Sequence, residues 1–227
     1  MSNFDPPIEL HKELNPVLWA DERILPEVNL ALLRIAREFH KFLDIDAPLV
    51  DVVISGSQAN YNYTEHSDID LHLIVDMTGI QCDEPIQELF DAKRKLWKLK
   101  HTIDIHGIPV EAYAEDSLKP AVSSSYSLLT NTWQRGPDIP VIDYNRAEVE
   151  RRVDMWRRVI FAALASREIH QLELVSDLLI KYRKLGLAQD GEFGAANLTF
   201  KSLRNSGLLD ELRQTLDRLK DLDLSLD

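Results

Sequence analysis

The stretch GSQANYNYTEHSDID, residues 56–70, decides how this chain is expected to fold. It follows the run VDVVIS (50–55), whose β-branched residues predict a buried strand. It leads into DIDLHLIV (68–75), where polar and apolar residues alternate and predict a second strand. The polar stretch is therefore a loop between two neighbouring strands, and both of its ends lie at strand termini.

The residue types at the two ends of this loop point to phosphate and metal chemistry. Gly56 lets the backbone approach a ligand closely, and Ser57 offers an N–H and a hydroxyl to a phosphate oxygen. Asp68 and Asp70 are expected on one strand face, about 7 Å apart along the chain, with His72 in a supporting role beside them. Two neighbouring carboxylates repel each other unless a cation lies between them. Hard oxygen ligands suit Mg²⁺ or Mn²⁺, and two such ions about 3.5–4 Å apart clamp an in-line displacement at phosphorus.

A third carboxylate is expected on a later hairpin. The runs HTIDI (101–105) and IPVEAYA (108–114) are separated by His106-Gly107, a pair that suits a two-residue turn. Glu111, flanked by apolar residues in the second run, is the preferred metal ligand. Asp104 is the alternative, because a two-residue turn places residues 104 and 111 on the same face of the hairpin.

The rest of the chain predicts helices and a division into two parts. Helices are expected from Leu25 onward, over 84–100, and throughout 146–227. We therefore expect an α/β core over 1–120 with a loosely packed proline-containing arm, an ordered connection over 121–145, and a helical part over 146–227. In the helical part, Lys201 and Arg204 fall on one helix face and are the first candidates to bind the phosphates of a nucleotide.

Composition excludes several classes of protein. The 227 residues carry a formal charge of −12, so a long polyanion is repelled and no extended nucleic-acid surface is expected. A single cysteine excludes an intrachain disulfide. The N-terminus lacks the pattern of a signal peptide and no run is long enough to cross a membrane, so a cytoplasmic location is expected.

Gly56-Ser57, the pair Asp68 and Asp70, and the run PVEAY around Glu111 together resemble the DNA polymerase β-like nucleotidyltransferase superfamily over about residues 48–115. The segments HTIDIHGIPVEAYAED, SYSLLTNTW and GEFGAANLTFKSLRNSGLLDELR are similar to small predicted nucleotidyltransferases of bacteriophages and bacteria. The resemblance implies an α+β fold, with a small mixed sheet flanked by helices and followed by a helical C-terminal half.

The function that this resemblance implies is metal-dependent transfer of a nucleoside monophosphate from an NTP, with ATP the first choice, and release of pyrophosphate. The acceptor is left open among a small molecule, a protein side chain and an RNA end. Two alternatives keep the same fold. One is a nucleotide-binding regulatory module without catalysis, and the other is a component of a toxin–antitoxin pair whose helical half contacts a partner protein.

Overall fold

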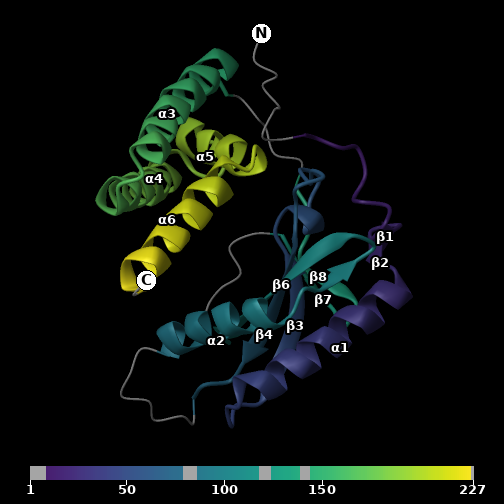
Figure 1. The fold of residues 1–227 in the computed structure, drawn as a ribbon. Coiled ribbons are helices and arrows are strands. Elements are labelled where there is room, and N and C mark those ends of the chain that lie inside the picture. The colour runs from purple at the N-terminus through teal and green to yellow at the C-terminus, as the bar shows by residue number, and fades with distance from the viewer. Residues whose placement is uncertain (1–8, 79–85, 118–123, 139–143, 226–227) are drawn as a thin grey trace. The chain divides into compact units, whose positions relative to one another are not determined.

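The computed structural model describes residues 9–78, 86–117, 124–138 and 144–225. Its contacts divide the chain into two compact units, an α/β unit within 9–140 and a helical unit from 141 onward (Figure 1). Each unit has its own hydrophobic core. The protein is thus of the α+β class, and the units are described one at a time.

A six-stranded mixed sheet forms the centre of the α/β unit, in the order β5-β6-β4-β3-β7-β8. Its strands are β3 (Leu49–Ser55), β4 (Ile69–Val75), β5 (Asp104–Ile105), β6 (Ile108–Asp116), β7 (Ser125–Ser127) and β8 (Thr132–Arg135). Strands β4 and β6 are parallel, whereas the other neighbouring pairs are antiparallel. The strands expected over 50–55 and 68–75 are confirmed as the two central strands.

Two helices cover one face of this sheet (Figure 1). Helix α1 (Pro26–Leu43) begins with proline, which suits the first helical turn, and ends at Asp44, which adopts a left-handed conformation with φ of 51°. Helix α2 (Ile86–Lys100) connects β4 to β6, as a parallel pair requires. The helix expected from Leu25 onward is therefore confirmed, and the helix expected over 84–100 is confirmed over 86–100, while residues 84 and 85 lie outside the described residues.

The hairpin expected around His106-Gly107 is also confirmed. Ile105 pairs with Ile108, and both turn residues have positive φ, 53° for His106 and 81° for Gly107. Two consecutive residues with positive φ match the twist of antiparallel strands joined by a two-residue loop. The short strand β5 thereby borders the first residues of β6 only.

The N-terminal segment differs from the expected loose arm. Leu18 and Trp19 are buried, and β1 (Trp19–Ala20) pairs with β2 (Arg23–Ile24) in a small second sheet. The indole N–H of Trp19 donates to the backbone oxygen of Gln58 at 2.7 Å. Residues 9–24 are therefore packed against the loop that follows β3, while Pro6 and Pro7 lie outside the described residues.

The connection expected over 121–145 also differs. Residues within it form β7 and β8, and Tyr126 is 1% exposed in the core. β7 pairs with β3, so this segment completes the sheet on the side opposite β6. The serine-rich and asparagine-rich composition concealed two strands because both are short.

The helical unit contains α3 (Arg146–Ser166), α4 (Ile169–Asp190), α5 (Ala195–Asn205) and α6 (Leu208–Leu224). The Asn145 side chain caps α3 by accepting from the N–H of Glu148 at 3.1 Å. Gly186 allows α4 to approach α5 closely, because a Cβ there would lie 2.3 Å from that of Ala196.

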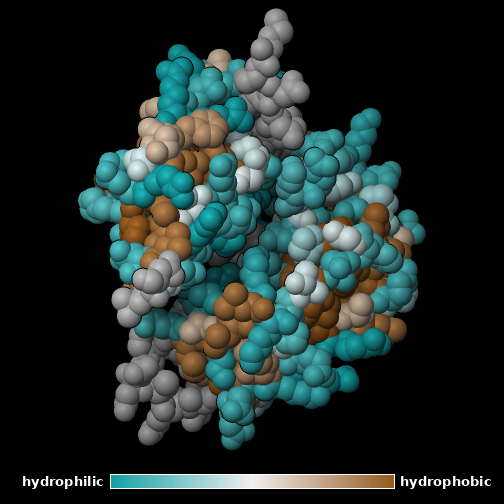
Figure 2. All heavy atoms as spheres, viewed as in Figure 1, coloured by the Kyte–Doolittle hydropathy of each residue, from teal (hydrophilic) through white to brown (hydrophobic). Residues whose placement is uncertain are grey.

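Hydrophobic residues reach the surface among hydrophilic ones in both units (Figure 2). Phe161 and Leu185, for example, are each 54% exposed in the helical unit. Among the helices of the described residues, none combines the length and the apolar composition that a membrane crossing demands.

Candidate active site

The sheet brings four polar residues into one row. Ser125 of β7 pairs with Ser55 of β3, Ser55 pairs with Asp70 of β4, and Asp70 pairs with Glu111 of β6. Register partners on adjacent strands lie about 5 Å apart and point to the same face. The sequence separates Asp70 from Glu111 by a helix, whereas the parallel pairing makes them neighbours.

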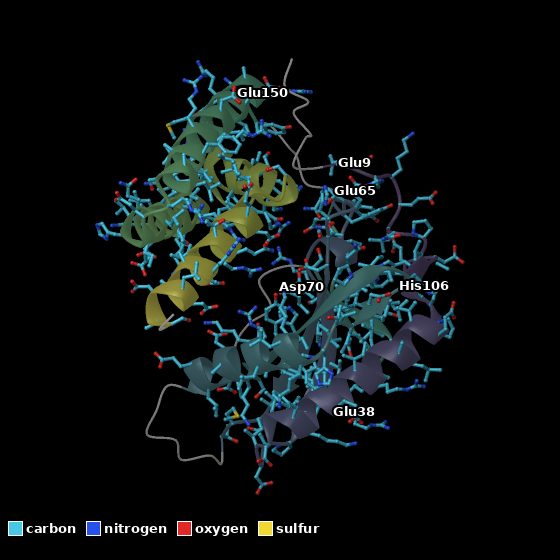
Figure 3. All side chains as sticks on the ribbon, viewed as in Figure 1. Glu9, Glu38, Glu65, Asp70, His106 and Glu150 are labelled. Carbon is cyan, nitrogen blue, oxygen red and sulfur yellow. The ribbon has the colours of Figure 1, made fainter. Side chains whose placement is uncertain are left out.

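Asp70 is the most perturbed acid in this row (Figure 3). Burial and the negative charges of Asp68 and Glu111 together raise the pKa of its carboxyl to about 6, against a lowering effect of His72. Asp68 stands immediately before β4. The charges of Asp68 and Glu111 therefore act on Asp70, and a perturbed acid of this kind is a common property of functional sites.

The backbone of Gly56 packs directly against the side chain of Asp70. Its φ is 74°, and a Cβ at this position would lie 2.1 Å from Oδ2 of Asp70. The residue is therefore restricted to glycine for two reasons, a left-handed backbone and direct contact with the carboxylate. The sequence predicts that the backbone of Gly56 closely approaches a ligand. In the structure the group it approaches is the carboxylate of Asp70.

The loop after Gly56 is held by buried polar side chains. Ser57 starts the short 3₁₀ helix η1 (Ser57–Ala59), and its hydroxyl donates to Oγ of Ser67 at 2.9 Å. Gln58 is 1% exposed; its amide donates to the backbone oxygen of Ser67 at 3.2 Å and accepts from Asn15 at 2.9 Å. The position of Ser57 is thus fixed by the loop itself and by residue 15 of the N-terminal segment.

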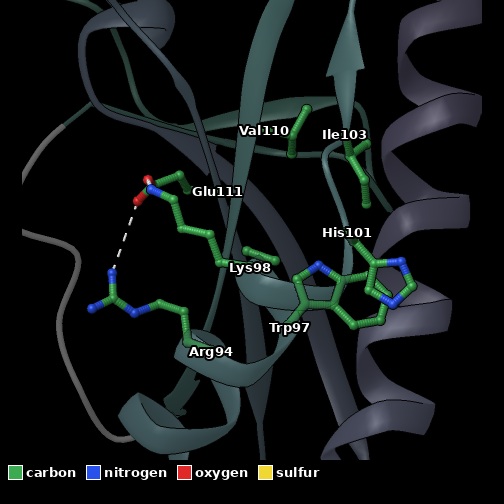
Figure 4. A pocket seen from close by; sticks show the side chains of 8 residues that line it. Arg94, Trp97, Lys98, His101, Ile103, Val110 and Glu111 are labelled. Carbon is green, nitrogen blue, oxygen red and sulfur yellow. Dashed lines mark hydrogen bonds and ion pairs between the residues drawn. The ribbon is translucent and has the colours of Figure 1, made fainter. Parts of the chain in front are cut away.

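Glu111 is contacted by two cations from α2 (Figure 4). Lys98 donates to Oε1, while Nη1 of Arg94 lies 3.9 Å from Oε2. The hydroxyl of Tyr113 donates to Oε2 at 2.8 Å. Burial works to raise the pKa of Glu111, but the hydrogen bonds from Lys98 and Tyr113 and the two positive charges hold it below its ordinary value.

Asp104 lies on the same face of the hairpin but has a different environment. It is exposed, pairs in register with Pro109, and accepts a hydrogen bond from the N–H of Gly107 at 3.0 Å. This hydrogen bond stabilises the turn of the hairpin. The geometry therefore brings Glu111, rather than Asp104, into the row with Asp70.

His72 joins three strands on the same face. Its Nδ1 donates to Oε1 of Glu115 at 3.0 Å, and its Nε2 lies 2.9 Å from Oγ of Ser55. The ring stacks on Tyr113 with a centroid distance of 4.9 Å and an interplanar angle of 13°. His72 thus has the hydrogen-bonded supporting position expected for it, next to Asp70.

Lys201 and Arg204 belong to the helical unit, on α5. Nζ of Lys201 is 2.9 Å from Oε1 of Glu192, so this lysine is held by an ion pair within its own unit. Arg204 is exposed near the end of the helix. Their role with a nucleotide stays a prediction from the sequence.

The residues present fit a divalent cation by their chemistry. Among the described residues no group of three His, Cys, Asp or Glu side chains is placed to hold a metal ion, and Lys98 forms an ion pair with Glu111. However, the Lys98 side chain is 68% exposed and can move away. Asp70 is held next to other negative charges at a raised pKa, and a cation would relieve this cost. The donors are all carboxylate oxygens, as Mg²⁺ prefers.

Ser125 adds a further polar group to the row. It is 2% exposed, and its Oγ has no hydrogen-bond partner among the described residues. A buried hydroxyl without a partner is unfavourable unless a ligand or water satisfies it. The row of polar residues therefore ends in a buried hydroxyl at Ser125.

Several residues of the site escape the sequence motifs. Lys98 and Arg94 were signalled only by the basic run KRKLWKLKH (93–101), which stands out in an acidic chain. Gln58 and Asn15 gave no signal, since polar residues in a loop are usually solvated. Comparisons with protein-family models, curated proteins and solved structures gave no match.

Proposed function

We propose that this protein is a metal-dependent nucleotidyltransferase that transfers a nucleoside monophosphate from an NTP to an acceptor. One observation carries the proposal: Asp70 and Glu111 are register partners on parallel strands, with Asp68 beside them and Gly56 packed against Asp70. The fold alone does not carry it, because one fold supports many functions.

The acids hold and neutralise charge in this reaction. Asp68, Asp70 and Glu111 are the residues that would hold Mg²⁺ or Mn²⁺, which supplies positive charge to the phosphates and to the attacking oxygen. The backbone N–H groups of Gly56 and Ser57 contribute donors for the β- and γ-phosphates, and the Ser57 hydroxyl adds another once it turns away from Oγ of Ser67. These donors are preorganised, because Ser67 and Gln58 fix the loop.

The chemical step forms a bond between the acceptor oxygen and the α-phosphorus and breaks the bond between that phosphorus and the bridging oxygen. Pyrophosphate leaves with the bonding electrons, and the acceptor proton passes to Glu111. Lys98 must first leave Glu111, because its ammonium lowers the basicity of that carboxylate. Lys98 and Arg94 are then available to the phosphates.

The test is label transfer by the full-length protein. Purified protein is incubated with each α-³²P-labelled NTP, Mg²⁺ or Mn²⁺, and a cell extract, and products are separated by thin-layer chromatography and gel electrophoresis. We expect metal-dependent label in a product and in none of the reactions of the Asp68→Asn/Asp70→Asn double variant. Glu111→Gln should lose more than about a hundredfold in rate.

Asp104→Asn is the matched control, because Asp104 is an exposed acid on the same hairpin that only supports its turn. It should keep full activity, and loss in Asp104→Asn with activity in Glu111→Gln would reassign the third carboxylate. Turnover by the double variant would contradict the proposal. Nucleotide binding without turnover of any NTP would favour the regulatory module.

A further inference from the structure

The C-terminal half of α2 concentrates positive charge in an acidic protein. Residues 93–101 contain five lysines and arginines, one histidine and no acid, although the whole chain carries −12. Cations are favourable at a helix C-terminus in any case, so the charge alone is not a site. The second observation is a pair of cavities on either side of Trp97.

The two cavities share Trp97, His101 and Ile103. The smaller, about 30 Å³, reaches Glu111 and is lined by Lys98 and Arg94 (Figure 4). The larger is a groove of about 530 Å³ between α1 and α2. Its volume lies within the range of small-molecule sites. The groove and the smaller cavity that reaches Glu111 are therefore neighbours that share three lining residues.

Flat rings line the groove. Trp97 lies 4.0 Å from His101 and 5.4 Å from Phe42 between ring centroids. Trp97 is 8% exposed and belongs to the core, whereas His101 is exposed. The rings are tilted to one another, by 38° for Trp97 and His101 and by 57° for Trp97 and Phe42. Aromatic side chains can stack on nucleobases without selecting a particular base.

The edge of the groove is positive. Arg34 and Lys41 of α1 line it, and Nζ of Lys100 lies 5.3 Å from the Phe42 ring centroid. The only acid among the lining residues, Glu38, accepts a hydrogen bond from Lys41 at 2.8 Å. A ligand that is flat at one end and anionic at the other fits this arrangement.

We propose that the groove between α1 and α2 binds a nucleoside phosphate, which is the acceptor of the transfer reaction. Its base stacks on Trp97 and His101, its phosphate pairs with Arg34 and Lys41, and its hydroxyl is delivered toward Glu111. The acceptor role rests on the proposed function, whereas binding in the groove does not. The ligand is either a free nucleotide or the terminal nucleotide of an RNA strand.

The experiment measures binding to the full-length Asp68→Asn/Asp70→Asn variant in EDTA, so that no metal-bound nucleotide contributes. AMP, a five-nucleotide single-stranded RNA and inorganic phosphate are titrated by calorimetry. We expect AMP and RNA to bind and phosphate alone to bind far more weakly. Arg34→Ala and His101→Ala should each weaken binding by about tenfold.

Arg37→Ala is the control, since Arg37 is an exposed arginine of the same helix that does not line the groove. It should leave the affinity unchanged. Tighter binding of RNA than of AMP assigns a strand end, and the reverse assigns a free nucleotide. No binding of either ligand at millimolar concentration, or binding that Arg34→Ala and His101→Ala leave unchanged, would overturn the inference.

Failure of this inference is distinguishable from failure of the proposed function. Label transfer that requires Asp68 and Asp70 but occurs without nucleotide binding in the groove would leave the function standing and remove the acceptor site. Groove binding that responds to Arg34→Ala, in a protein that transfers no label, would leave a nucleotide-binding groove and remove the reaction.

Discussion

Strands β3, β4 and β6 carry buried apolar side chains on one face and a row of polar side chains on the other. On one face Ile54 and Leu71 are fully buried and Ala112 is 3% exposed. On the other face their sequence neighbours Ser55, Asp70 and Glu111 form the polar row. Because adjacent side chains point to opposite faces, a shift of one residue moves a substitution from the core to the site. Stability and chemistry should therefore be separable by single substitutions.

The largest effect on folding is expected from the core face. Leu71→Ala removes a fully buried side chain and should lower the free energy of unfolding by about 3–4 kcal/mol, measured by urea denaturation. The folded fraction should bind Mn²⁺ with the same affinity as the wild type, for which the proposed function predicts metal binding. Loss of metal binding in folded Leu71→Ala protein would mean that the two faces are not separable.

Gly56→Ala tests the contact between the loop and the acid. A Cβ would lie 2.1 Å from Asp70 in a backbone with φ of 74°, so we expect about 2–3 kcal/mol of destabilisation and loss of transfer. Gly107→Ala is the control, since its φ is 81° but nothing lies within 4 Å of the added atom. It should cost only the left-handed strain, about 1–2 kcal/mol, and keep activity.

The variant Asp70→Asn should show how much the ionised Asp70 carboxylate destabilises the folded protein. The folded-state pKa of about 6 lies above the ordinary aspartate value, so the folded state holds the proton more tightly than the unfolded state. The stability from this proton is present below about pH 4 and is lost as pH rises through 6. In EDTA, Asp70→Asn should therefore be more stable than wild type at pH 8, by on the order of 2 kcal/mol, and equal at pH 4. Thermal denaturation at both pH values measures this, and a variant less stable at pH 8 contradicts it.

Lys98→Ala should produce the smallest change, a gain in metal affinity of about fivefold in the absence of nucleotide, because Lys98 competes for Glu111. Titration with Mn²⁺ followed by electron paramagnetic resonance measures the affinity directly. Lys95→Ala, an exposed lysine of the same helix, serves as the control. Weaker binding in Lys98→Ala would show that Lys98 supports the site instead of competing for it.

Local patterns predicted the elements that hold the acids. The β-branched run before Gly56, the alternation in β4 and the His106-Gly107 turn each specify their conformation over a few residues. They also allowed Glu111 to be chosen, since its strand was recognisable. Such features depend on residues that are close together in the sequence, so a single sequence is enough to predict them.

Long-range contacts were not accessible in the same way. Nothing local shows that Asn15 bonds to Gln58, that β7 joins β3, or that Lys98 reaches Glu111. A short strand and a polar loop residue look the same whether they are solvated or packed. The parallel pairing of β4 with β6 places Asp70 beside Glu111, and only the structure reveals this pairing.

That parallel pairing also sets the order in which the site can assemble during folding. β3 and β4 are consecutive and antiparallel, so they can pair early, whereas β6 reaches β4 only after the chain has crossed over through α2. Asp70 and Glu111 therefore meet late, as contacts of high sequence separation do. A metal ion bound by both carboxylates would leave the refolding rate unchanged and slow unfolding, because it would stabilise only the completed sheet.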